Sequence, residues 1–204
     1  MQAPELKSAI TESMTQIATH SDELRDLDAA LGDGDLGITI SSGAKAVVTA
    51  LETLDDTVTP AEIAKACAKA FANANPSTMA ALVAGALLAG SKAWADKPEI
   101  GQVEAVEFGR AAAESISKRG KSEVGDKTVL DALVPAVEAL AAAPDGVAGL
   151  RSAIAAAEKG VVDTKGLQSR RGRASWLQER SIGLQDPGAT ALLRFLESWP
   201  TPRA

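Results

Sequence analysis

The spacing of apolar residues along the chain is that of α-helices. Leu6, Ile10, Met14 and Ile17 follow one another at intervals that place them on one face of a helix. Further helices are predicted over 59–71, 77–94, 104–118, 130–140, 145–160 and 188–199. No segment alternates apolar and polar residues as a strand would. The pattern therefore predicts an all-α fold of about eight helices.

Two helix ends are marked by their residues. Thr59 is expected to cap the helix that follows it, with Pro60 at the first helical position and Glu62 completing a capping box. Gly120 is expected to lie just beyond the end of another helix, where glycine tolerates a left-handed conformation.

Composition and charge narrow the class of protein. The 41 alanines, with no tyrosine and only three tryptophans and three phenylalanines, favour helices over sheets. A formal charge of −6 argues against nucleic-acid binding, which needs a basic face. The chain has no apolar run long enough to span a membrane, and the composition of its first residues leads us to expect no signal peptide. We expect one cytoplasmic domain over residues 1–204, bound to neither membrane nor nucleic acid.

The segment 28–37 concentrates carboxylates and glycines. With Asp26 just before it, it places Asp28, Asp33 and Asp35 close enough in sequence to repel one another. A bound divalent cation would relieve that repulsion, and a set of oxygen ligands selects Mg²⁺ or Ca²⁺ over zinc. The alternative is a solvated acidic turn between two helices.

Three familiar motifs do not fit their surroundings. Residues 32–37 match GxGxxG, but a helical pattern precedes them and two aspartates would repel a pyrophosphate. An EF-hand loop that begins at Asp33 would need glutamate where Ala44 stands. Residues 120–122 resemble the end of a P-loop, but the upstream glycine and strand are missing.

The chain offers no pairing of a nucleophile with a base. The single histidine, His20, lies at a predicted helix end, and Cys67 is expected to pack as a small core residue. The segment 165–188 is basic, and its arginines are Arg170, Arg171, Arg173 and Arg180. An acidic metal site, glycine turns and arginines together suit phosphoryl transfer, which depends on positioning and charge neutralisation.

Four blocks of sequence occur in the order and spacing of a known family. They are LDAALGDGDLG at 27–37, RGK at 119–121 with GDKTVLDALVP at 125–135, GRASWLQERSIG at 172–183 and QDPGAT at 185–190. Through these blocks the chain resembles the nucleotide-binding (ADP-binding) subunit of dihydroxyacetone kinases over its whole length. The resemblance implies eight antiparallel helices in a closed barrel, with the nucleotide at one end.

The resemblance also implies site residues. Asp28, Asp33 and Asp35 would hold two Mg²⁺ ions that bridge the phosphates of ADP or ATP, and would act in catalysis through those ions. The implied nucleotide contacts are Leu36, Gly37, Ile38, Thr39, Pro76, Ser77, Thr78, Gly120, Val129, Arg173, Asp186, Pro187 and Gly188.

Two positions depart from the family pattern. Leu36 stands where the family usually has histidine, and residues 73–78 replace a Gly-Gly-Ala-Ser-Gly segment under the nucleotide. Three alternatives follow from these departures and from the acidic segment. They are a paralogue acting on another short sugar, a non-catalytic helical module that binds Mg²⁺ and nucleotide and regulates a partner, and a helical protein that binds Ca²⁺ structurally.

The resemblance implies that the chain is half of an enzyme. In the family, a histidine on a separate subunit or domain holds the substrate covalently. We therefore predict a phosphotransferase of the glycerone kinase type, acting on a ketose or small sugar bound to such a substrate-binding subunit. The phosphoryl donor is either ATP or a protein of the phosphotransferase system that rephosphorylates bound ADP. Self-association of the chain is a further possibility.

Overall fold

The computed structural model describes residues 1–200, which form nine α-helices and three short 3₁₀-helices and contain no strand. The α-helices are α1 (Ala3–Ile17), α2 (Ser21–Leu31), α3 (Leu36–Glu52), α4 (Pro60–Ala74), α5 (Thr78–Ala93), α6 (Gln102–Gly120), α7 (Leu130–Ala142), α8 (Gly146–Asp163) and α9 (Pro187–Glu197). The 3₁₀-helices are η1 (Ala18–His20), η2 (Thr164–Gly166) and η3 (Arg173–Ser181). The predicted all-α class is confirmed, and residues 201–204 of the predicted domain lie outside the described part.

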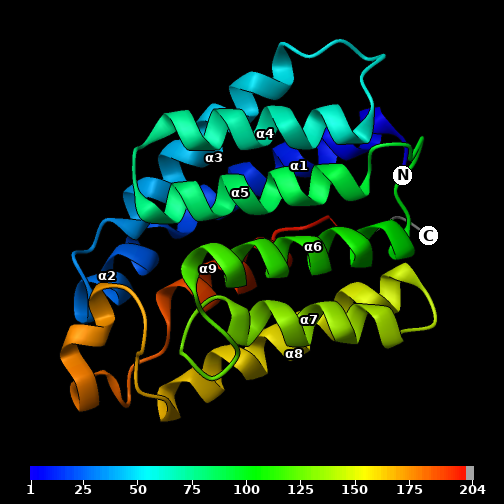
Figure 1. Ribbon diagram of the computed structural model, residues 1–204. Coiled ribbons are helices and arrows are strands. Elements are labelled where there is room, and N and C mark those ends of the chain that lie inside the picture. The colour runs from blue at the N-terminus through cyan, green and yellow to red at the C-terminus, as the bar shows by residue number, and fades with distance from the viewer. Residues whose placement is uncertain (201–204) are drawn as a thin grey trace.

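The helices pack in the order in which they occur along the chain. Each helix from α3 to α9 contacts the next, and α1 contacts both α3 and α9. These contacts close a ring of eight helices within residues 1–200, an arrangement compatible with the predicted barrel. The remaining helix, α2, lies at one end of the ring (Figure 1). No helix of the described chain combines the length and the apolar character that a membrane span requires.

Because neighbouring helices alternate in direction, each end of the ring has both helix starts and helix ends. Helices α3, α5, α7 and α9 all begin at the end where α2 lies, which we call the site end (Figure 1). The first turn of each helix has unpaired backbone N–H groups and a partial positive charge. Each of these helix starts therefore favours an anion placed directly against it.

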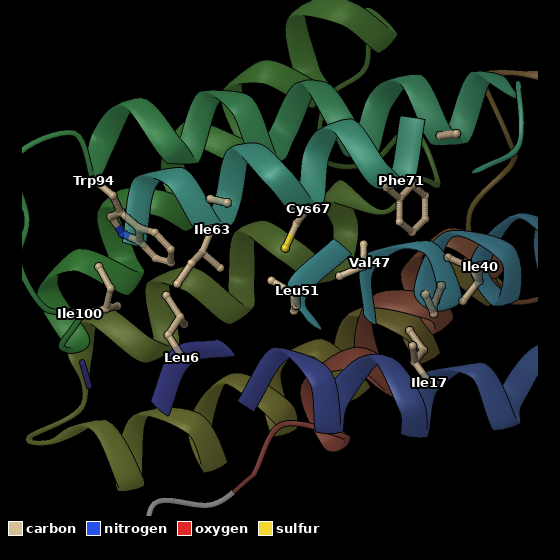
Figure 2. Packing of buried hydrophobic residues seen from close by; sticks show 14 of the residues in the cluster. Leu6, Ile17, Ile40, Val47, Leu51, Ile63, Cys67, Phe71, Trp94 and Ile100 are labelled. Carbon is tan, nitrogen blue, oxygen red and sulfur yellow. The ribbon is translucent and has the colours of Figure 1, made fainter. Parts of the chain in front are cut away.

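Small residues allow the helices to approach one another closely. The main core lies mostly among the first five helices, with contributions from α9, and includes Leu6, Ile63 and Cys67 (Figure 2). A second core, between α7, α8 and α9, consists of Ala132, Ala136, Ala153, Ala157, Val161, Ala189 and Leu193. The predicted core position of Cys67 is confirmed, and burial raises the pKa of its thiol to about 12, which leaves it unreactive.

The helix boundaries confirm one capping prediction and correct another. Thr59 Oγ1 accepts a hydrogen bond from the Glu62 amide at 3.3 Å, and the Glu62 carboxylate accepts one from the Thr59 amide at 2.8 Å. Gly120, in contrast, is the last residue of α6. Lys121 takes the left-handed conformation expected there, with φ of 49°.

The loop in the acidic segment is shorter than the predicted residues 28–37, because helices extend into it from both sides. Asp28 lies in the last turn of α2, and the loop itself is only residues 32–35. The helix that follows, α3, is absent from the predicted ranges. Its first turns contain Ile38, Thr39 and Ile40, whose branching at Cβ lowers helix propensity. Burial of residues such as Ile40 and Val47 outweighs that local preference.

The close crossing of α7 and α8 gives a test of packing. A Cβ atom at Gly160 would lie 2.3 Å from the Asp131 carbonyl oxygen, so Gly160→Ala should lower the free energy of unfolding by about 1–3 kcal/mol. Gly146 begins the same helix with no atom within 4 Å of its Cβ position, and Gly146→Ala is the matched control. Urea denaturation measures both, and equal effects of the two substitutions would contradict this packing.

Candidate functional site

Three carboxylates converge where α2 meets α3. Asp28, Asp33 and Asp35 each place one oxygen within 4.8 Å of the others, and we call them the acidic triad. Asp28 Oδ2 also accepts a hydrogen bond from the Leu36 amide at 3.2 Å, which fixes that carboxylate against the start of α3. Oxygen ligands at this spacing fit a hard divalent cation such as Mg²⁺ or Ca²⁺. The triad that the sequence predicted is thus brought together.

Two glycines allow the triad to form. Gly34 turns the loop with φ of 74°, a conformation that side chains with a Cβ rarely adopt. A Cβ at Gly37 would lie 2.1 Å from the Ser21 carbonyl oxygen, so only glycine lets α3 begin directly against α2. This contact fixes the position of Asp35, the residue just before α3, relative to Asp28 on α2.

Arg173 reaches the acidic triad from a distant part of the chain. Its Nη1 donates a hydrogen bond to Asp33 Oδ2, across a sequence separation of 140 residues, and lies 3.9 Å from Asp35 Oδ2. The Arg173 side chain is 59% exposed and is therefore accessible to a ligand from solvent. The acidic and basic segments singled out in the sequence form one site, and neither segment's own pattern predicted their contact.

A polar network joins the starts of α3 and α5. Asn75 Nδ2 donates to Thr39 Oγ1 at 2.9 Å, and Thr39 Oγ1 lies 3.4 Å from Ser77 Oγ. Ser77 also caps α5 by accepting a hydrogen bond from the Ala80 amide at 3.0 Å. The residues that replace a glycine-rich family segment therefore connect two helix N-termini, and the role of Asn75 was not predicted.

The starts of α7 and α9 lie beside that of α5. A Cβ at Gly188 would lie 3.5 Å from Met79 and 3.6 Å from Val129, so the first turns of three helices touch there. Asp186 caps α9, because its Oδ2 accepts a hydrogen bond from the Ala189 amide at 2.7 Å.

The predicted site residues all lie at the site end. The first turn of α3 contains Leu36, Gly37, Ile38 and Thr39; Pro76, Ser77 and Thr78 begin α5; Gly120 ends α6; Val129 precedes α7; Asp186, Pro187 and Gly188 begin α9. Leu36 stands where the family usually has histidine, and its side chain is buried in the main core. The group of Leu36 that contacts Asp28 is its backbone amide. The single histidine, His20, interacts with Glu23 at 3.2 Å.

Comparison with known proteins identifies the family. Residues 30–201 match the model of the DAK2 domain, and the chain belongs to this family. It is 32% identical over 184 residues to the ADP-binding subunit DhaL of the PEP-dependent dihydroxyacetone kinase of Escherichia coli, covering 88% of this chain and 87% of that subunit. It is also 32% identical over 194 residues to the L-erythrulose 1-kinase of Mycolicibacterium smegmatis, covering 93% of this chain and 34% of that protein. The chain thus spans about a third of that relative.

A solved structure has the same fold. The dihydroxyacetone kinase from C. freundii, in complex with AMP-PNP and Mg²⁺, superposes with a TM-score of 0.77 at 22% identity, over 97% of this chain and 34% of that one. This similarity confirms the helical fold independently of the sequence blocks.

The Asp186 carboxyl predicts a pH dependence. Its burial raises its pKa from 3.8 to about 7, and the charge of Asp131 adds to the shift. Between these values the folded protein keeps a proton that the unfolded chain has lost, so this carboxyl destabilises the fold as pH rises. The stability of the wild type relative to Asp186→Asn should therefore fall from pH 5 to pH 8 in urea denaturation.

The control for this measurement is another helix cap. Asp145 caps α8 through the Ala148 amide at 2.8 Å but is exposed, so Asp145→Asn reports the effect of changing a capping carboxylate to an amide. A wild-type advantage over Asp186→Asn that is constant or grows with pH would contradict the assignment.

Proposed function

We propose that this chain is the nucleotide-binding subunit of a dihydroxyacetone-type kinase, acting as one domain over residues 1–204. It holds Mg²⁺ with ADP or ATP at the site end and transfers a phosphoryl group to a short ketose bound on a partner subunit. The observation that carries the proposal is the meeting of the acidic triad, Arg173 and helix N-termini in one place.

The charges at the site end suit a metal–phosphate ligand. The acidic triad alone would repel a nucleotide, but its oxygens are the ligands that Mg²⁺ prefers. Asp28, Asp33 and Asp35 would hold the metal, two ions in the family pattern, and the metal would bridge and neutralise the phosphates. The N-termini of four helices and the Arg173 guanidinium add positive charge around the same position.

The neighbouring residues supply the proposed nucleotide contacts. The first turn of α3 and the residues that begin α5 are joined by the Thr39–Ser77 contact, and Gly188 brings α9 against Val129. Gly120 lies on the adjoining end of α6. Arg173 would contact the transferred phosphoryl group, where a guanidinium stabilises the charge that develops.

The names of the relatives support a proposal for the partner and the donor. Those in Escherichia coli and Listeria innocua are named ADP-binding subunits of PEP-dependent kinases, and the Mycolicibacterium protein is an L-erythrulose 1-kinase about three times as long as the matched segment. We propose that a separate subunit supplies the substrate and the histidine that holds it, and that dihydroxyacetone or erythrulose is the acceptor. A phosphotransferase-system protein, or ATP, would supply the phosphoryl group.

Metal and nucleotide binding can be tested at Asp33. Asp33→Asn keeps the shape of the side chain but removes a charged ligand, so titration calorimetry should detect no binding of Mg²⁺-ADP. With Mg²⁺-ADP at 100 times its dissociation constant, the free energy of unfolding of the wild type should rise by about 2.7 kcal/mol, and that of the variant should not change. Asp26→Asn, on α2 with Asp28 but outside the acidic triad, is the matched control and should bind normally. Full affinity in Asp33→Asn would refute the metal assignment.

Catalysis can be tested by adding the partner. The chain mixed with a dihydroxyacetone kinase substrate-binding subunit, Mg²⁺ and a phosphoryl donor should form phosphorylated dihydroxyacetone or erythrulose, detected by mass spectrometry. Omission of either protein should abolish the product. Binding of Mg²⁺-ADP without product from any donor would instead favour a regulatory module, the alternative raised by residues 73–78.

A further inference from the structure

The segment that carries Arg173 is a loop with a closed base. Residues 167–181, which we call the arginine loop, leave and rejoin the helical body at neighbouring points. The Ser169 amide donates to Ser181 Oγ at 2.9 Å, and the Gly183 amide donates to the Lys165 carbonyl at 2.8 Å. The tip projects into solvent, where Trp176 is 79% exposed. The tip contacts α2, and its position also depends on how the base of the loop is held.

A buried lysine joins the two limbs of this base. Lys127 is only 3% exposed, and its backbone has φ of 61°. Its Nζ donates hydrogen bonds to the Leu167 carbonyl at 3.1 Å and to the Ser181 carbonyl at 2.5 Å. One limb contributes the first acceptor and the other limb contributes the second. An ammonium group is costly to bury, so its placement between these carbonyls is a specific feature of the turn.

The preceding residue, Asp126, holds the start of the tip. Its side chain is 2% exposed, and its Oδ2 accepts a hydrogen bond from Arg171 Nε at 2.7 Å. Its carbonyl accepts a hydrogen bond from the Arg170 amide at 3.1 Å. Burial alone would raise the pKa of Asp126, but the hydrogen bonds from Arg171 and from the Glu123 amide keep it below its usual value. The Asp126 carboxylate therefore holds the arginine loop at Arg171, which lies two residues before Arg173.

The turn that carries both residues is itself fixed to α7. Asp131, in the first turn of α7, accepts hydrogen bonds from the Gly125 amide at 2.6 Å and from the Thr128 amide at 2.7 Å. A continuous set of contacts thus runs from α7 through residues 125–128 to the arginine loop. It ends at the ion pair between Arg173 and Asp33.

We propose that Asp126 and Lys127 are positioning residues for Arg173. They hold the arginine loop so that the Arg173 guanidinium faces the acidic triad, and Arg171 is the link between Asp126 and the tip. This inference rests on the proposed function, because the purpose of the placement is to aim Arg173 at metal-bound phosphates. Without these contacts, an exposed arginine on a loop would be free to turn into solvent.

The experiment is a double-mutant cycle on the full chain. Arg171→Gln should raise the calorimetric dissociation constant of Mg²⁺-ADP roughly tenfold. In the Arg173→Ala background the same change should have less than about a twofold effect, because the contact that it positions is already gone. Arg170→Gln is the matched control, because it removes the same charge one residue earlier in the loop. The Arg170 side chain is 68% exposed and lies 3.9 Å from the Asp126 carboxylate, so this change should leave the affinity unchanged. Lys127→Met, in the same cycle, tests the second positioning residue.

A second measurement needs no nucleotide. Trypsin should cleave after Arg180 faster in Arg171→Gln than in the wild type or in Arg170→Gln, because the loop is then less firmly held. Equal losses of affinity with and without Arg173, or unchanged affinity in Arg171→Gln, would overturn the proposal. If the wild type bound no Mg²⁺-ADP, the proposed function would fail. Equal rates of trypsin cleavage in Arg171→Gln and the wild type would separately refute the positioning of the arginine loop. A variant that unfolds is recognised by its circular dichroism, and the Lys127→Met cycle then decides.

Discussion

The repulsion between Asp28, Asp33 and Asp35 is the constraint on which the site end depends. Carboxylate oxygens within 4.8 Å of one another repel by roughly 1–3 kcal/mol per pair, depending on exposure to water. The start of α3, beside Asp35, offsets only about 0.3–1 kcal/mol of this. The remainder requires a full positive charge close by. Arg173 provides one in this structure, and the proposed Mg²⁺ would provide more.

Close packing of helices brings these charges together. Gly37 allows α3 to start against Ser21, and Gly160 allows α8 to lie against the backbone of α7 at Asp131. Alanines fill the second core, where larger side chains would push α7, α8 and α9 apart. The alanine content that first indicated helix propensity therefore has a second role, because it allows α7, α8 and α9 to pack closely at the site end.

The predictability of each feature depended on whether its determinants were local. The capping box at Thr59 involves residues three apart and could be predicted, as could the oxygen-rich character of the acidic triad. The helix α3 could not, because its early residues disfavour a helix and only burial in the assembled core stabilises it. The contact of Arg173 with Asp33 joins residues 140 apart. The residue pattern of one segment does not show which distant segment will contact it in the folded chain.

The resemblance included residues 125–128 in one of its blocks but implied no role for them, and the burial of Asp126 and Lys127 in the structure supplies one. Asp126 and Lys127 lie in GDKT, where a sequence pattern alone would place two opposite charges on a surface turn. Each is instead almost wholly buried and bonded to the arginine loop rather than to its neighbour. A buried charge is costly unless it has its own hydrogen-bond partners. Asp126 and Lys127 each find such partners on the arginine loop, which explains why two charged residues are buried side by side. The proposed metal ligands lie close together in sequence, at the junction of α2 and α3, whereas the arginine that pairs with Asp33 is positioned from the opposite side of the helical ring.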